Sequence, residues 1–385
     1  MLKILIAPDS FKGSLTSLQA AAAIEAGVKR VLPRALCFKV PLADGGEGTV
    51  QALVDALGGT FHYKQVTGPA GKAVRARYGL LADNETTVLE VAATSGLYLV
   101  DSKHRNPMNA TSYGAGELIV AAAERGAKRI IIGIGGSATV DAGMGMAQAI
   151  GVRFSDSNGR VIQQPGCGRL LERVAGIDLS AVPEILRKIR IQVACDVENP
   201  LYGEAGAATV YGPQKGATPA MVRRLDSGLK QFSSVVSKEL DLDKANAKGA
   251  GAAGGLGYGL TVFTRARISG GLNLIAGMTG LKEKIAAADL VITGEGRIDA
   301  QTAFGKAPAG VAKLGKRLKV PVIAIGGSLG DGSQALFQQD IQGLEAAVTE
   351  SVPLKMVLQH AEKNLTDAAE RALRLILVGN RLAEI

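Results

Sequence analysis

The chain has 385 residues, of which 47% are hydrophobic and 21% are charged. This composition is that of a globular protein, and the length exceeds what one hydrophobic core usually supports, so we expect two domains. The formal net charge of +9 suits an anionic small molecule better than nucleic acid, because the basic residues are scattered along the chain. Aromatic residues make up only 4%, without Trp, which argues against stacking platforms for single-stranded nucleic acid.

The three cysteines, Cys37, Cys167 and Cys195, show neither metal nor disulfide spacing, which fits a reducing compartment. No apolar run approaches the ~20 residues that a membrane span needs. A strand pattern follows Met1 directly, so we expect no signal peptide and a cytoplasmic location.

The N-terminal segment alternates between strand and helix patterns. An apolar run at 2–7 predicts a buried strand, and Thr16 with Gln19 forms a capping-box pattern before an Ala-rich helix. A second strand is expected at 36–42, followed by a helix to about Leu57. This order is typical of the start of a parallel sheet.

The middle of the chain does not continue this alternation of strand and helix patterns. The segments 61–66 and 73–81 alternate polar and apolar residues on either side of a Gly-Pro-Ala-Gly turn, which predicts a hairpin. Further short strands are expected at 88–91, 129–134 and 191–195, and a helix is expected at 221–240.

The earlier rhythm returns after about residue 274, with strands expected at 290–293, 321–325 and 345–349 and helices at 281–287, 308–318 and from about 355. Five strands with intervening helices favour a flavodoxin-like doubly wound parallel sheet, with strand order 2-1-3-4-5. The middle would be a second α/β domain with a mixed sheet, inserted after the second strand–helix unit. The predicted domains are therefore 1–61 together with 276–385, and 62–275.

Acids, lysines and glycines follow several of these strands. In open α/β sheets, ligands bind at the carboxyl ends of the strands, and the predicted order places 9–14 beside 294–302. Carboxylates there can hold Mg²⁺ together with phosphate oxygens, while lysines and backbone N–H groups can spread the charge of a phosphoryl group. The pattern indicates phosphoryl transfer.

The segment 133–138 also fits the G-x-G-x-x-A fingerprint of dinucleotide sites, with Asp156 near the place of the ribose-binding acid. An NAD(P)-dependent oxidoreductase acting on a small hydroxy acid is therefore one alternative, and a non-catalytic sensor of sugar acids or nucleotides is another. A more general interpretation is an anion site, in which glycines and Ser137 present N–H groups at the start of a helix. Asp141 could then hold a cation or a sugar hydroxyl.

The motifs, taken together and in order, resemble those of the bacterial glycerate kinases. They are IAPDSFKGSLT (6–16), PLADGGEGT (41–49), VTGPAG (66–71), IGIGGSATVDAGMG (132–145), ACDVENPLYG (194–203), YGPQKGAT (211–218), GAGAAGGLGYG (249–259) and ADLVITGEGRIDAQTAFGKAP (288–308). The resemblance implies a two-domain α/β enzyme with its site between the domains, which phosphorylates D-glycerate to 2-phosphoglycerate with Mg-ATP in glyoxylate or glucarate catabolism.

On this hypothesis the expected partners are D-glycerate and ATP, without nucleic acid or membrane, and a homodimer is one assembly open to the chain. Asp196 and Asp44 are the expected base or metal ligand, and Lys12 completes the catalytic set. The expected substrate-binding residues are Asp9, Ser10, Arg297, Asp299 and Gln301. The expected residues for the nucleotide are Gly135, Gly136, Ser137, Asp141 and Lys215, and those for Mg²⁺ are Glu295 and Glu47.

Overall fold

The structure is a computed structural model, and it describes residues 1–304 and 306–383. The chain divides into two compact units, which we treat separately. Unit 1 comprises Met1–Asp44, Gln51–Leu57 and Leu272–Ile385, and unit 2 comprises Gly45–Val50 and Gly58–Gly271. The predicted limits at 61/62 and 275/276 lie a few residues beyond two of these crossings, and the sequence did not indicate the short excursion at 45–50.

Unit 1 is built on a parallel sheet. Its five strands, counted over the described residues, follow the order β13-β12-β11-β1-β2, which confirms the predicted order. They are β1 (Lys3–Pro8), β2 (Leu36–Lys39), β11 (Leu290–Ile298), β12 (Val322–Leu329) and β13 (Gly343–Ala346). The first and third strands are therefore neighbours, with Ile4 paired to Leu290 and Pro8 to Gly294.

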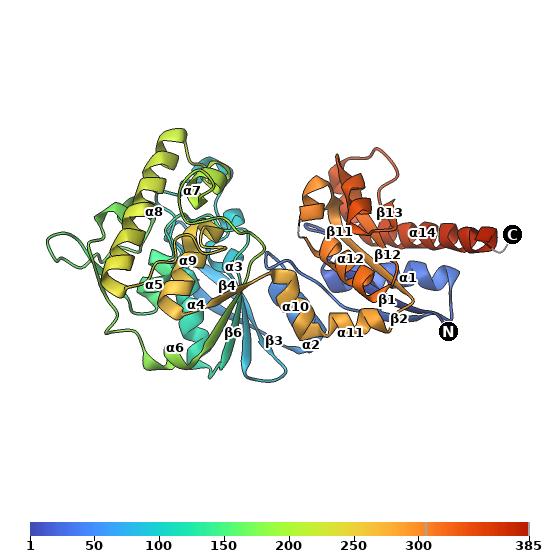
Figure 1. Cartoon of the computed structure of the whole chain (residues 1–385), viewed down its shortest axis with the longest axis horizontal. Coiled ribbons are helices and arrows are strands. Elements are labelled where there is room, and N and C mark those ends of the chain that lie inside the picture. The colour runs from blue at the N-terminus through green and yellow to red at the C-terminus, as the bar shows by residue number, and fades with distance from the viewer. Residues whose placement is uncertain (305, 384–385) are drawn as a thin grey trace. The chain divides into compact units, whose positions relative to one another are not determined.

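Helices cover both faces of this sheet. Ile4, Ile6, Ile292 and Ile325 face α1 (Ser17–Val31) and α14 (Ala361–Ala383), and these two helices run side by side (Figure 1). The opposite face contacts α12 (Ala307–Leu318), where a Cβ on Gly315 would lie 2.3 Å from Val322. The predicted capping box at Thr16 and Gln19 is present. The remaining helices of this part are α2 (Thr49–Leu57), which starts in unit 2, α10 (Gly271–Thr279), α11 (Leu281–Ala286) and α13 (Leu354–Gln359).

Unit 2 holds a mixed sheet, as predicted, with the order β10-β9-β6-β5-β4-β3 over the described residues. The strands are β3 (Gly59–Thr67), β4 (Ala73–Leu81), β5 (Thr86–Glu90), β6 (Arg129–Gly133), β9 (Arg190–Ala194) and β10 (Arg267–Ser269). The predicted hairpin is the antiparallel pair β3–β4, while β5, β6, β9 and β10 run parallel. A small ribbon, β7 (Arg153–Ser155) with β8 (Gly176–Asp178), lies apart from this sheet.

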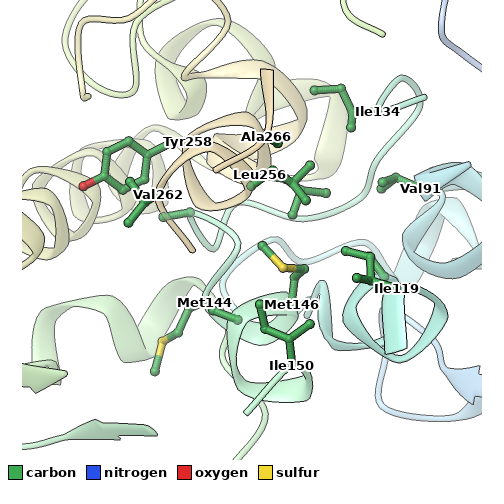
Figure 2. Packing of buried hydrophobic residues seen from close by; sticks show 14 of the residues in the cluster. Val91, Ile119, Ile134, Met144, Met146, Ile150, Leu256, Tyr258, Val262 and Ala266 are labelled. Atoms are coloured by element: carbon green, nitrogen blue, oxygen red, sulfur yellow. The ribbon is translucent and has the colours of Figure 1, made fainter. Parts of the chain in front are cut away.

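The core of unit 2 is large and rich in small and sulfur-containing side chains. Figure 2 shows part of it, where side chains from three helices gather, among them Ile119, Met146 and Leu256. These helices are α4 (Tyr113–Glu124), α5 (Met144–Ala149) and α9 (Ala252–Thr264). The others are α3 (Val91–Ser95), α6 (Glu184–Lys188), α7 (Ala207–Tyr211) and α8 (Pro219–Leu240). Among the described residues, no helix has both the length and the apolar content needed to cross a bilayer.

Several predicted elements differ in extent from the structure, among them β2, which ends at Lys39, and β12, which continues to Leu329. The strand expected at 290–293 continues to Ile298 as β11, and the strand expected at 345–349 is β13 at Gly343–Ala346. No helix opens at Ser137, because the chain stays irregular until α5 begins at Met144. The dinucleotide fingerprint requires a helix directly after its glycines, so this difference removes the structural basis of the oxidoreductase interpretation.

Candidate functional site

A cavity of about 510 Å³ opens in unit 1 at the carboxyl ends of β1, β11 and β12. This is the size range of small-molecule sites, and it lies where open α/β sheets bind ligands. One part is charged, and its lining includes Asp9, Lys12, Asp44, Glu295, Arg297 and Lys306. The other part is apolar, and its lining includes Val348, Val352, Leu354, Val357 and Leu358. The cavity therefore has a charged side, formed by five predicted site residues together with Lys306, and an apolar side.

Asp9 directly follows β1 and is only 6% exposed. Its amide donates a 2.8 Å hydrogen bond to the carbonyl of Gly294, and its Oδ1 accepts the amide of Ser10 at 2.6 Å. Burial, and then the negative charge of Asp44, raise the pKa of Asp9 to about 7, against the opposing effects of the Ser10 amide and Lys12. A carboxyl group with such a pKa can take up or release a proton near neutral pH.

Glu295 lies on β11, nearly buried, and its carboxylate has two partners. The hydroxyl of Thr302 donates to Oε1 at 2.5 Å, and the ammonium nitrogen of Lys306 lies 3.6 Å from Oε2. Burial raises the pKa of Glu295, while Thr302 and Lys306 act to lower it. Glu295 thus offers a desolvated carboxylate next to a cation, on a rigid strand.

Close backbone approach explains the glycines around Glu295. A Cβ on Gly294 would lie 2.2 Å from the carbonyl oxygen of Ile325, and one on Gly296 would lie 3.3 Å from the amide nitrogen of Lys12. The sequence pattern of these two glycines suggested a turn. In the structure, their lack of a Cβ instead lets β11 continue between the nearby backbones of Ile325 and Lys12. The turn that carries Lys12 is closed by the amide of Phe11, which donates to the carbonyl of Leu15 at 2.9 Å.

Two of the predicted substrate-binding residues have a local role in the structure. The carboxylate of Asp299 accepts the amide of Gln301 at 3.0 Å and pairs with Nε of Arg297 at 3.3 Å. Asp299 and Gln301 therefore shape the turn after β11, whereas the two-thirds exposed side chain of Arg297 lines the cavity. Ser10 also lines the cavity.

In unit 2, Lys215 organises the segment that contains Ser137. It is 3% exposed, and its Nζ donates to Oγ of Ser137 at 2.9 Å and to the carbonyl of Thr139 at 2.8 Å. Burial lowers the pKa of Lys215 to about 7, although the negative charge of Asp141 opposes this shift. Lys215 therefore supports the 137–139 segment from inside the protein.

The predicted anion loop differs in detail from the expectation. The amide of Gly135 donates to the carbonyl of Gly45 at 3.2 Å, and a Cβ on Gly135 would lie 2.7 Å from Cα of Gly46. Gly135 thus permits a close crossing of two backbone segments. Gly136 is exposed, with a φ of +74° that favours glycine.

Asp141 is fully buried, and its carboxylate is used within unit 2. Oδ2 accepts the amide and the hydroxyl of Ser112 at 2.8 and 2.7 Å, and Oδ1 accepts the amide of Gly143 at 3.1 Å. Burial raises the pKa of Asp141, and these hydrogen bonds oppose the shift. Asp141 positions the residues before α5 rather than facing solvent.

Glu47 is exposed on the loop 45–48 of unit 2. Its loop is anchored by a residue that the sequence analysis did not single out, Glu90 at the end of β5. The Glu90 carboxylate is buried and accepts the amide of Val50 at 2.6 Å. Burial raises the pKa of Glu90, while the amides of Val50 and Gly48 lower it.

Asp196 follows β9 and is exposed. Its Oδ1 accepts the amide of Gly271 at 2.9 Å, at the start of α10, where the chain passes from unit 2 to unit 1. Asp196 therefore holds the beginning of a connecting helix in addition to any role toward a ligand.

The described ranges, 1–304 and 306–383, contain no group of three or more His, Cys, Asp or Glu side chains arranged to hold a metal ion. Mg²⁺ commonly takes one or two carboxylates and completes its shell with water and phosphate oxygens. Carboxylates such as Glu295 fit that donor chemistry.

Three residues complete these sites but were not among the predicted site residues, and they are Thr302, Lys306 and Glu90. Thr302 and Lys306 lie in the same polar run as Glu295, so their proximity in sequence was an available signal. Glu90 gave no such signal, because it contacts Val50, which lies 40 positions away.

Comparison with known proteins finds that the chain is similar to glycerate kinases over nearly its whole length. The sequence model of the glycerate kinase family matches residues 4–377. The chain is 50% identical over 369 residues to a glycerate kinase of Halalkalibacterium halodurans, covering 96% of this chain and 97% of that one. It is 44% identical over 382 residues to the glycerate 2-kinase of Escherichia coli K12, covering 99% and 100% of the two chains.

A solved structure is similar to this chain over nearly its whole length. The protein, from Salmonella typhimurium LT2, is described as a candidate glycerate kinase 2, and it superposes with a TM-score of 0.88 at 44% sequence identity. The match covers 99% of each chain.

Proposed function

The chain belongs to the glycerate kinase family and is a kinase that phosphorylates an alcohol group, and on that premise we propose that it converts D-glycerate to 2-phosphoglycerate with Mg-ATP. The observation that carries the proposal is the unit 1 cavity, which combines cations for a carboxylate with a buried acid of raised pKa. Nothing in the described residues favours the oxidoreductase or the sensor.

Lys12 and Arg297 are the proposed contacts for the glycerate carboxylate. Both line the cavity, and Lys12 lies close enough to Asp9 to lower the pKa of that carboxyl group. A substrate carboxylate held at Lys12 would bring its neighbouring carbon, which bears the 2-hydroxyl, toward Asp9. Such a placement would favour transfer to the 2-position, and Ser10 is a further hydrogen-bonding group in the same cavity.

Asp9 is the proposed general base, whereas the sequence pattern alone favoured Asp196 or Asp44 for that role. A base works best when its pKa is close to the operating pH, and burial brings Asp9 there. The proton of the attacking hydroxyl would pass to Asp9 as the oxygen attacks phosphorus. Asp44, which raises the pKa of Asp9, would tune the base.

Glu295 and Lys306 are proposed to lie beside the phosphoryl group during its transfer. Lys306 would offset the negative charge of that group. Glu295 would supply a carboxylate oxygen for Mg²⁺, and Mg²⁺, when bound, neutralises phosphate charge. In unit 2, Gly136 and Ser137, supported by Lys215, are proposed for the nucleotide phosphates. Gly135 and Asp141 would support that segment, and Glu47 stays a predicted metal ligand.

The decisive experiment is an assay of ADP release from Mg-ATP with D-glycerate, followed by ³¹P NMR of the product. We expect ADP formation that depends on D-glycerate, and a phosphorus resonance coupled to the proton on carbon 2. A product phosphorylated at the 3-position would reject the regiochemistry, and no ADP release with D-glycerate would reject the substrate.

A further inference from the structure

Arg105 of unit 2 carries a buried donor for which the protein supplies no acceptor. Its Nε is shielded from solvent and has no hydrogen-bond partner in the described part of the chain. An unsatisfied buried donor is costly, and guanidinium donors stay charged at all relevant pH values. Such a group in a folded protein calls for an acceptor from outside the chain.

The chain packs Arg105 beside the loop that Lys215 supports. A Cβ on Gly216 would lie 2.5 Å from the carbonyl oxygen of Arg105 and 3.0 Å from its Cβ. Gly216 directly follows Lys215, whose Nζ donates to Ser137 and Thr139. Arg105 therefore adjoins the residue that fixes the position of Ser137.

Gly168 gives a second link in this region. A Cβ on Gly168 would lie 2.8 Å from the carbonyl oxygen of Pro107 and 2.9 Å from that of Val140. The segments that carry Arg105 and Ser137 are thus linked through the loop of Lys215 and Gly216, and both also lie close to Gly168.

The chemistry at Ser137 suits an anion. The Nζ of Lys215 donates to the Oγ of Ser137, so the proton of the Ser137 hydroxyl is left to donate elsewhere. The Ser137 hydroxyl and the guanidinium of Arg105 can supply donors, and Gly136 lies exposed beside Ser137. Arginine is well suited to bind two oxygens of one phosphate with parallel N–H groups.

We propose that Arg105 binds the phosphate chain of the nucleotide, together with Gly136 and Ser137. This inference rests on the proposed kinase function, and it adds a charged residue to the proposed phosphate-binding groups Gly136 and Ser137. The phosphate chain is favoured over the glycerate carboxylate, because Lys12 and Arg297 already supply cations for a carboxylate in the unit 1 cavity.

Arg105→Met in the full-length protein tests the proposal, with Arg223→Met as the control. Arg223 is exposed on α8 of the same unit, so its removal changes the net charge equally. Isothermal titration with ATP, with inorganic tripolyphosphate and with D-glycerate measures the three affinities, and thermal unfolding is followed with and without ATP.

We expect Arg105→Met to weaken ATP and tripolyphosphate binding by about tenfold to a hundredfold, the usual effect of losing charge-assisted hydrogen bonds. Glycerate affinity should not change, and the ligand-free melting temperature should stay the same or rise, because an unsatisfied donor is removed. Arg105→Lys should restore part of the affinity, since it keeps the charge without the paired donors.

Three results would overturn the proposal. Unchanged ATP affinity with a lowered melting temperature would assign Arg105 a structural role. Weakened glycerate binding alone would assign it to the carboxylate, and equal losses in Arg223→Met would reduce the effect to net charge. If the wild-type protein binds ATP but does not phosphorylate glycerate, the proposed substrate fails while the titrations still decide the role of Arg105.

Discussion

The ammonium nitrogen of Lys306 lies 3.6 Å from Oε2 of Glu295, inside the cavity of unit 1. The side chain of Glu295 is only 11% exposed, so this cation is the main charge that offsets the carboxylate locally. Lys306 is also the N-cap residue of α12. The local charge balance of Glu295 therefore depends mainly on Lys306.

Replacement of Lys306 by Met should lower kcat by about a hundredfold, the usual effect of losing one electrostatic contact to a transition state. The KM for glycerate should change much less, because Lys12 and Arg297 would still hold its carboxylate. Steady-state kinetics with Lys313→Met, an exposed lysine of α12, provides the control. A Lys306→Met variant with normal kcat would remove Lys306 from phosphoryl transfer.

The pH dependence of the reaction should report Asp9. Since the pKa of Asp9 is raised to about 7, kcat/KM for glycerate should rise from pH 6 to pH 8 as this group loses its proton. In Asp9→Asn the rise should be absent and kcat should fall by about a hundredfold or more. A wild-type profile that is flat between pH 5 and pH 9 would show that Asp9 does not act as the base.

The same residue should make stability depend on pH. The folded protein holds a proton on Asp9 up to about pH 7, whereas the unfolded chain releases it near the ordinary pKa of 3.8. Its contribution is thus fully present below pH 4 and is lost as the pH rises through 7, by at most about 4 kcal/mol. Asp9→Asn should therefore be more stable than the wild type at pH 8 and similar to it at pH 4. Urea unfolding at both pH values measures this, and an equal difference at the two pH values would contradict it.

Asp196→Asn separates the earlier candidate for the base from Asp9. If Asp196 accepts the proton, kcat of Asp196→Asn should fall at least about a hundredfold. On the structure we expect a smaller loss than in Asp9→Asn, because Asn can still accept the Gly271 amide through its carbonyl oxygen. The two kcat values measured side by side decide between the residues.

Two glycines of unit 1 should respond oppositely to Ala. Gly294→Ala would place a Cβ 2.2 Å from the carbonyl oxygen of Ile325, between two strands that cannot separate, so it should destabilise by about 2 kcal/mol or more. Gly277→Ala lies in α10 with nothing within 4 Å of the new Cβ, and it should stabilise by about 1 kcal/mol. Chemical denaturation of both variants checks the pair, and a neutral Gly294→Ala would show that the β11–β12 spacing relaxes.

Much of the sheet of unit 1 followed from the sequence, because buried parallel strands are continuous apolar runs and their order follows a common winding pattern. The run Leu290–Thr293 gave β11, but its extension to Ile298 was missed. Glycine is favoured both in a tight turn and in a strand with close backbone neighbours. Gly294 and Gly296 were therefore compatible with either structure at the sequence level. The structure was needed to see that Ile325 fills the space.

The candidate site was predictable where its residues share one sequence segment or one strand end. Asp9, Lys12, Asp44 and Glu295 were chosen on that basis, and they line one cavity. Contacts between distant loops gave no pattern to read, as with Lys215 and Ser137, which are 78 positions apart. The role of such residues depends on their burial, which the sequence does not show. Asp141 is fully buried and bonds within unit 2, and the buried Nε of Arg105 has no hydrogen-bond partner among the described residues.

The interrupted sheet of unit 1 also sets an order of events during protein synthesis. Thr293 of β11 donates its hydroxyl proton to the carbonyl of Ala7 in β1, and the two residues are 286 positions apart. At roughly 5–20 residues per second, a ribosome needs about 15–60 s to travel from one to the other. The whole of unit 2 leaves the ribosome in that interval, so the nascent chain completes the inserted part first. The N-terminal strands meanwhile remain an apolar segment without its central partner, which is a natural target for chaperones.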